Sequence, residues 1–218
     1  TRFQHDSDVI FDTLDATLHQ LQLALKLVDY TKNRHFVCVK NDYRSNLLNF
    51  IANGNFEETI WDDQTAMMYL KKEDALKLEI KIPDGIQVHP LSKANAEKVN
   101  SIWPHASPGS EKFIAYCIEH NPSVGVFNEN NELLAWCLFH DFGCLLALQT
   151  DPNHLRKGYG EIAARAITKQ IAEDLNFDCV ANVILSNVKS MNLFTKIGFY
   201  QIDTNSWIGV GKLTPQIL

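Results

Sequence analysis

Cysteine is scarce and unpaired in this sequence, which excludes two common kinds of site. Five cysteines are spread over 218 residues, and none stands in a C-x-x-C pair. An odd number of widely separated cysteines predicts neither a disulfide framework nor a zinc site. The eight histidines show no H-E-x-x-H pattern, so we predict no metal. We expect reduced, mostly buried thiols at Cys38, Cys117, Cys137, Cys144 and Cys179.

Clustered positive charge and long apolar runs are also missing. The formal net charge is −6, without a polybasic run, which argues against a nucleic-acid surface. No signal-peptide pattern and no apolar segment long enough to cross a bilayer is found. The longest apolar region, residues 133–148, is broken by a turn-like segment at residues 140–143 and indicates a hairpin. We expect an intracellular protein, cytoplasmic or mitochondrial, that binds neither nucleic acid nor membranes.

Apolar residues make up 45% of the chain, enough for one large domain or two small ones. Residues 1–84 read as an α/β region, in which residues 36–39 and 78–82 are expected to be strands. Four leucines recur there at helical spacing: Leu14, Leu18, Leu21 and Leu25. Pro83-Asp84-Gly85 then turns the chain, and we place a domain boundary between residues 1–84 and 85–218.

Residues 85–218 carry clearer signals. The expected order is strand, helix, three strands, helix, strand, helix, strand, which describes an α+β layer with a mixed sheet. The expected strands are residues 86–88, 123–127, 132–140, 144–150, 180–185 and 206–210.

Two helices of this region are well defined by the sequence. The helix after Gly160 keeps one apolar face, formed by Ile162, Ala163, Ala166, Ile167, Ile171 and Leu175. In the last helix, Asn187 is the expected N-cap and Gly198 suits the left-handed position just past the end. Phe199 would then pack back on Phe194.

The turn before the first of these helices is a candidate phosphate site. Amide donors from Arg156 to Gly160 would point into the space before the helix, where the positive end of the helix dipole favours a phosphate, and glycine at 158 and 160 lets the phosphate approach closely. Arg156 and Lys157 could add charge, or could be solvated turn residues. The stretch is not a P-loop, because the sequence has no G-x-x-x-x-G-K-[ST] motif. It is not a G-x-G-x-x-G fingerprint either, because Ala163 stands at the third glycine position.

One series of segments resembles the GCN5-related N-acetyltransferase (GNAT) superfamily. It runs from the strand at 144–150 through the G-x-G turn and the helix after it to the strand at 180–185 and the last helix. The last helix contributes Asn187-x-x-Ser190-x-x-Leu193-Phe194-x-Lys196-x-Gly198-Phe199. Residues 99–199 are similar to its glycine N-acyltransferase branch, called FR47-like. In that branch the N-terminal half is a degenerate related unit, which residues 1–84 would match.

The resemblance implies a coenzyme A site. The strands at 144–150 and 180–185 would splay apart and admit pantetheine, while the turn holds the pyrophosphate. The residues implied in acyl-CoA binding are Leu148, Gln149, Thr150, Arg156, Lys157, Gly158, Tyr159, Gly160, Asn187 and Ser190.

Three positions depart from the family pattern. Leu155 stands where the turn usually has Arg or Gln, Cys144 where glycine N-acyltransferases carry a proposed general-base glutamate, and Phe194 where many members have tyrosine. As catalytic candidates we retain Ser190, which could hydrogen-bond the departing sulfur, and Cys144. Ser190 could instead support the helix start, and Cys144 could be inert packing. The neighbouring His140 and Asp141 are expected to be solvated.

The implied function is CoA-dependent N-acyl transfer to a small amine or amino acid, by direct attack of the amine on the thioester. A basic peptide is a possible acceptor, given the acidic chain. Two alternatives remain open. One is a non-catalytic acyl-CoA binder or sensor, and the other is an interaction module with a vestigial pocket.

Overall fold

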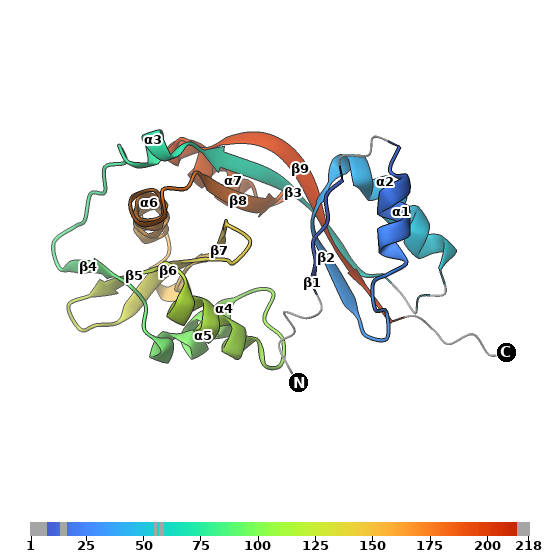
Figure 1. Ribbon diagram of the computed structural model, residues 1–218. Helices are drawn as coiled ribbons and strands as arrows, with labels where there is room; N and C mark the ends of the chain where they lie inside the picture. The colour runs from blue at the N-terminus through green and yellow to red at the C-terminus, as the bar shows by residue number, and fades with distance from the viewer. Residues whose placement is uncertain (1–7, 14–16, 55, 57–58, 213–218) are drawn as a thin grey trace. The chain divides into compact units, whose positions relative to one another are not determined.

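The structure is a computed structural model that describes residues 8–13, 17–54, 56 and 59–212 (Figure 1). The chain divides into two compact units. The larger comprises Met68–Val183 and Asn187–Ile202. The described residues of the smaller lie within 8–67, 184–186 and 203–212. Two long strands, β3 (Thr59–Leu70) and β9 (Tyr200–Val210), contribute to both units.

The sheet of the larger unit runs in the order β3-β8-β7-β6-β5-β4. Neighbours from β4 to β7 are antiparallel, whereas β7 and β8 are parallel. This confirms the expected mixed, mostly antiparallel α+β fold. The strands are β4 (Ile86–His89), β5 (Ser123–Asn128), β6 (Leu133–Phe139), β7 (Cys144–Thr150) and β8 (Cys179–Ile184).

Helices cover both faces of this sheet. Figure 1 shows α6 on one side of β5, β6 and β7, with α4 and α5 on the other. The core of the α4–α5 face is built around Val99, Phe113, Trp136 and Leu138. The helices are α3 (Lys72–Ala75), α4 (Ala96–Ile102), α5 (Ser110–His120), α6 (Tyr159–Gln170), which continues as a π-helical turn at Ile171–Leu175, and α7 (Val188–Ile197).

The expected apolar face of α6 is confirmed, apart from its last member. Leu175 is only half-buried, because it ends the π-helical turn, where the helical spacing changes. The five buried members are Ile162, Ala163, Ala166, Ile167 and Ile171.

Both ends of α7 are as expected. Asn187 Oδ1 accepts a hydrogen bond of 3.1 Å from the Ser190 N–H, and Gly198 adopts φ 118° just past the helix. Phe199 packs edge-on against Phe194, with ring centroids 5.1 Å apart. The strand that follows, β9, begins at Tyr200 rather than at residue 206.

One expected strand is wrong, and several elements were missed. Residues 78–82 belong to no strand but run beside α6, where Lys169 Nζ donates to the Leu78 carbonyl at 3.3 Å. Of the three alternating apolar residues, Leu78 is buried, Ile80 is half-buried and Ile82 is 48% exposed, so the alternation here does not mark a place in the sheet. The longer elements that were not predicted are helix α2 (Asn41–Asn53), helix α5 and strand β3.

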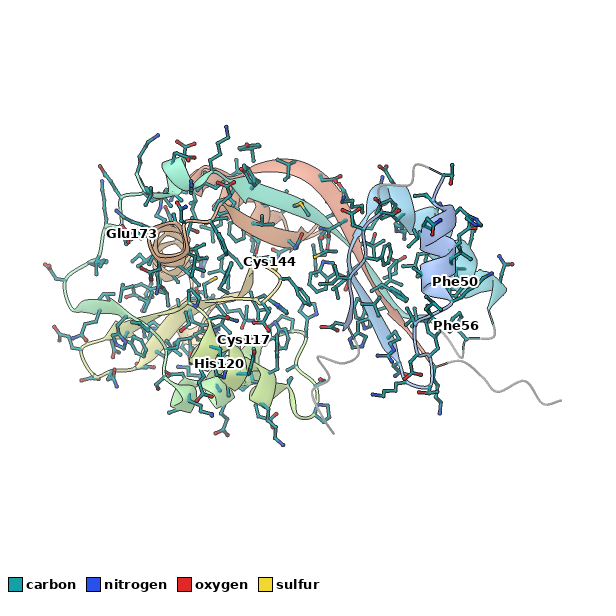
Figure 2. All side chains as sticks on the ribbon, viewed as in Figure 1. Phe50, Phe56, Cys117, His120, Cys144 and Glu173 are labelled. Carbon is teal, nitrogen blue, oxygen red and sulfur yellow. The ribbon has the colours of Figure 1, made fainter. Side chains whose placement is uncertain are left out.

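The smaller unit packs two helices on a short sheet of order β1-β2-β9-β3. Its other elements are β1 (Asp8–Val9), α1 (His19–Leu25), β2 (Arg34–Lys40) and α2 (Asn41–Asn53). Leu21 and Leu25 are buried as expected, Leu18 caps α1, and Leu14 lies outside the described residues. Phe50 and Phe56, labelled in Figure 2, pack against each other with their rings tilted by 54° and the ring centroids 5.9 Å apart.

Strand β2 confirms the strand expected at residues 36–39. The domain boundary placed at residue 84 stays a prediction. So does the relation of residues 1–84 to a degenerate GNAT-like half.

Replacing Gly198 with alanine should lower the free energy of unfolding by about 1 kcal/mol, because a Cβ disfavours the positive φ that ends α7. Urea unfolding followed by circular dichroism measures the change. Thr195→Ala, at an exposed position of the same helix, is the control and should stay within about 0.5 kcal/mol of the parent. Equal stability of the Gly198 variant and the parent would contradict this account of the helix end.

Candidate functional site

Strands β7 and β8 separate soon after they meet. They pair in parallel only at Cys144 with Val180 and at Leu145 with Ala181. Burial follows the pairing: Cys144 and Leu145 are buried, whereas residues 146–150 are all half-buried. A strand that loses its neighbour leaves backbone N–H and C=O groups available on that side. The second half of β7 therefore offers an open edge within the sheet.

A bulge in β7 coincides with this separation. Trp136 pairs with Gln149 and Leu138 with Leu146, so two residues of β7 lie opposite one of β6. Ala147, within the bulge, has φ +49°, which is uncommon for a residue with a side chain. Bulges bend a strand and turn its backbone groups out of the ladder. The bulge thus re-aims the backbone beside Leu148.

The turn that follows β7 is anchored by Asp151. Its carboxylate accepts from the Asn153 N–H at 2.9 Å and forms a 2.9 Å ion pair with Lys98 of α4. The hydrogen bond from Lys98, followed by that from the Asn153 N–H, lowers the pKa of Asp151. These contacts fix the start of the 3₁₀ turn Pro152–His154 and hence the path into α6.

The segment Arg156–Gly160 forms a tight entry to α6. Arg156 has φ +61° and Gly158 has φ +84°. Both residues adopt the left-handed backbone conformation, which turns the chain from β7 into α6. The first N–H groups of a helix have no intrahelical acceptor, and here they belong to Tyr159 and Gly160. They lie at the positive end of the helix dipole, which suits an anion.

Two residues implied in CoA binding meet at this turn. A Cβ placed on Gly160 would lie 2.9 Å from Thr150 Oγ1, whereas one on Gly158 would meet nothing within 4 Å. Gly160 therefore lets the helix start approach the end of β7. Gly158 leaves open space in front of the turn, as a bound phosphate requires.

A surface groove of about 450 Å³ opens beside the turn. Its lining includes Glu79, Lys81 and Pro83 on one side and Lys157, Gly158 and Arg165 on the other. Lys157 and Arg156 are exposed. Room and positive charge are thus available at the turn.

The first turn of α6 is tied to α7. Glu161 forms ion pairs with Lys196 of α7 at 2.6 Å and with Arg165 at 3.0 Å. Partial burial raises the pKa of Glu161, but the hydrogen bonds from Lys196 and Arg165 outweigh it and lower the pKa overall. The carboxylate of Glu161 is therefore already paired within the protein.

Comparisons with known proteins agree with this geometry. Residues 123–208 match the family model described as FR47-like protein. A Drosophila protein of known structure is 24% identical with a TM-score of 0.85, and the match covers 95% of this chain and 71% of that chain. The chain has the GNAT fold.

Two further GNAT structures have a TM-score of 0.57. One is a GCN5-related N-acetyltransferase from Kribbella flavida, 14% identical, covering 96% of this chain and 79% of that chain. The other is a tandem GNAT protein from the clavulanic acid biosynthesis pathway. It is 11% identical, and the match covers 91% of this chain and 70% of that chain. The resemblance to the FR47-like branch of the superfamily is confirmed.

In this GNAT fold, Asn187 and Ser190 lie together at the start of α7. Asn187 is exposed and its Oδ1 is engaged by the Ser190 N–H. Ser190 is half-buried and precedes Phe194 by four residues, on the same helical face. The structure thus shows both residues at the helix cap, and their contacts to a ligand stay a prediction.

Phe194 and Cys144, the two residues that depart from the expected acid–base pattern, are both buried. Phe194 is 3% exposed and packs on Phe199. Cys144, labelled in Figure 2 at the start of β7, is 5% exposed. Its role as a base stays a prediction.

The expectation that His140 is solvated is wrong, because the residue is only 5% exposed. It stacks on Phe142 with centroids 3.9 Å apart, and Nδ1 accepts from the Phe142 N–H at 3.2 Å. Aromatic packing at the hairpin turn therefore buries it. Asp141 is exposed and accepts from the Asn121 amide.

Four of the five thiols are buried, and Cys38 is half-buried. Burial raises the pKa of Cys117 and of Cys179 to about 12. Within the described residues, no group of three or more His, Cys, Asp or Glu side chains could hold a metal ion. The described helices include none with the length and apolar character to cross a bilayer.

The ion pair of Asp151 predicts a pH-dependent stability. Because its pKa is lowered in the folded state, its contribution is present above the unfolded value of about 4 and is lost as pH falls through the folded value. Asp151→Asn should lower the free energy of unfolding by about 1 kcal/mol at pH 7. Urea titrations at pH 7, 5 and 3 should show this difference shrinking below pH 4. A constant difference across that range would contradict it.

Proposed function

We propose that the protein transfers an acyl group from acyl-CoA to the amino group of a small amine or amino acid. The observation that carries the proposal is the separation of β7 from β8 after Leu145, directly before a turn suited to a diphosphate. Pantetheine fits the open edge of β7, where residues 146–150 are half-buried. The amides of Lys157 to Gly160 fit the pyrophosphate.

Each part of the ligand has a counterpart in the chain. Backbone groups of Leu148, Gln149 and Thr150 would bind the pantetheine amides, which need one donor and one acceptor each. Arg156 and Lys157 would screen the phosphate charge from the exposed rim. Gly158 leaves the space in front of the turn free. Asn187 and Ser190, at the start of α7, would bound the pantetheine on the opposite side.

The reaction needs no covalent intermediate with the protein. The amine nitrogen attacks the thioester carbonyl carbon, the C–S bond breaks, and the thiolate takes a proton while the amine loses one. Amides re-aimed by the bulge near Leu148 would donate to the carbonyl oxygen as it becomes negative. The protein's main contribution would be to hold amine and thioester together.

The thiolate can leave without a dedicated acid. An alkyl thiol has a pKa of about 8.5, so forming the thiolate near pH 7 costs only about 2 kcal/mol. Ser190 could stabilise the sulfur through a hydrogen bond from its hydroxyl. Cys144 is a poor base in its buried position, so the acceptor would arrive already neutral or lose its proton to water.

A second candidate is a non-catalytic acyl-CoA binder or sensor. The buried Phe194 and Cys144 favour it, because neither supplies a titratable group exposed to a ligand. The two candidates share the binding site and differ only in turnover.

A thiol-release assay separates these candidates. Acetyl-, benzoyl- and long-chain acyl-CoA are each supplied with a panel of amino acids and small amines. We expect free CoA to appear at a rate that depends on the acceptor. CoA binding in calorimetry without acceptor-dependent release would favour the binder, and no CoA binding would contradict both.

Charge introduced at Gly158 should weaken CoA binding. Gly158→Asp should raise the dissociation constant at least tenfold, because the carboxylate would face the pyrophosphate, and Gly158→Asn should raise it less. Gly143 also has a positive φ, and a Cβ added there would meet no atom within 4 Å, so Gly143→Asp is the matched control. Calorimetry with CoA measures all three variants. Equal affinity of the Gly158→Asp variant and the parent would contradict the site.

A further inference from the structure

Three cationic side chains line the groove beside the start of α6: Lys81, Lys157 and Arg165. They come from two parts of the chain. Lys81 belongs to the segment before β4, whereas Lys157 and Arg165 belong to the turn and to the second turn of α6. The groove measures about 450 Å³, a volume typical of sites for small ligands. It is therefore large enough to take part of a ligand held at the turn.

The segment before β4 runs antiparallel to α6. Near the end of α6, Lys169 Nζ donates to the Leu78 carbonyl, whereas Pro83 lines the groove together with Lys157, just before the helix begins. The residues between Leu78 and Pro83 therefore lie along the first half of α6. This arrangement places Lys81 on the wall of the groove that faces the helix.

The cations of the groove keep donors for a ligand. Within the part of the chain that the structure describes, the ammonium groups of Lys81 and Lys157 make no hydrogen bond or ion pair. Arg165 donates to Glu161 through Nε, at 3.0 Å. Its two terminal amino groups are left for other acceptors, and both can bind the same phosphate.

Two carboxylates also line the groove, but they do not cancel its positive charge. Glu161 is already paired with Arg165 and with Lys196. Glu79 is exposed on the opposite wall. The three lining cations outnumber these two carboxylates, and Lys196 adds a fourth positive charge beside them. A cleft with an excess of one charge attracts ligands of the opposite charge, so the groove favours an anion.

We propose that Lys81 and Arg165 bind the ribose 3′-phosphate of acyl-CoA. This inference rests on the function proposed above, in which the diphosphate binds the amides of Lys157 to Gly160. The same ribose carries the diphosphate and the 3′-phosphate, so a diphosphate at the turn brings the 3′-phosphate to the adjoining groove. A phosphate monoester carries a charge of about −1.5 to −2 at neutral pH, which the two cations would offset.

The inference also defines the acyl donor. A 3′-phosphate is present on free CoA, but not on dephospho-CoA or on a phosphopantetheine arm attached to a carrier protein. The groove would therefore select free acyl-CoA over both. Lys81 lies outside residues 123–208, the part of the chain that matches the FR47-like model. This selection would thus depend on a segment beyond the family match.

Calorimetry with CoA and with dephospho-CoA tests the inference. We expect the parent to bind dephospho-CoA at least tenfold more weakly than CoA. Lys81→Met and Arg165→Met should each raise the Kd for CoA at least fivefold and change that for dephospho-CoA less than twofold, because only CoA carries the group they bind. An equal loss of affinity for both ligands in these variants would overturn the inference.

A matched control separates local binding from the loss of one charge. Lys112 is exposed on α5, on the other face of the sheet. Lys112→Met lowers the net charge of the chain as much as Lys81→Met does, and it should leave the Kd for CoA within twofold of the parent. A loss of affinity as large as in Lys81→Met would overturn the inference, since net charge would then explain both.

The two ligands also distinguish this inference from the proposed function. If the parent binds CoA and dephospho-CoA with equal affinity, only the inference fails. If it binds neither, the proposed function fails first. Raising the ionic strength from about 0.05 M to about 0.5 M should reduce the preference for CoA, because salt screens exposed charges. A preference that does not fall with salt would contradict recognition by Lys81 and Arg165.

Discussion

The short contact between β7 and β8 is the constraint on which the site depends. Two residue pairs hold these parallel strands together at their starts, and the pairing stops after Leu145. A bulge at Ala147 then changes the register with β6. Because a strand without a neighbour must satisfy its backbone elsewhere, the free half of β7 is where the proposed amide-rich ligand would bind.

Contacts on both faces of the sheet fix the end of β7. On the α6 face, Thr150 lies against Gly160. The turn at Arg156–Gly160 carries the free amides of the start of α6 and has open space beside Gly158. On the α4–α5 face, the side-chain amide of Gln149 donates to the Ile102 carbonyl at the end of α4. Ion pairs of Asp151 and Glu161 fix the turn between α4, α6 and α7, so the site is held by charges that are already paired.

Elements with explicit end signals could be predicted from the sequence. Asn187 and Gly198 define α7, and the apolar face of α6 follows from its spacing. Residues 78–82 could not be placed, because alternation of apolar and charged residues does not distinguish a strand from an extended segment that lies along a helix. The glycine turn was recognisable, whereas the pairing of Trp136 with Gln149 depends on a bulge that leaves no sequence signal.

The central claim is that coenzyme A binds with its pantetheine arm along the free half of β7. A crystal structure with a non-hydrolysable acyl-CoA analogue tests it most directly. The account predicts density for pantetheine between β7 and β8, with the pyrophosphate within hydrogen-bond distance of the amides from Lys157 to Gly160. An analogue bound elsewhere, with β7 unoccupied and the turn free of phosphate, would contradict it.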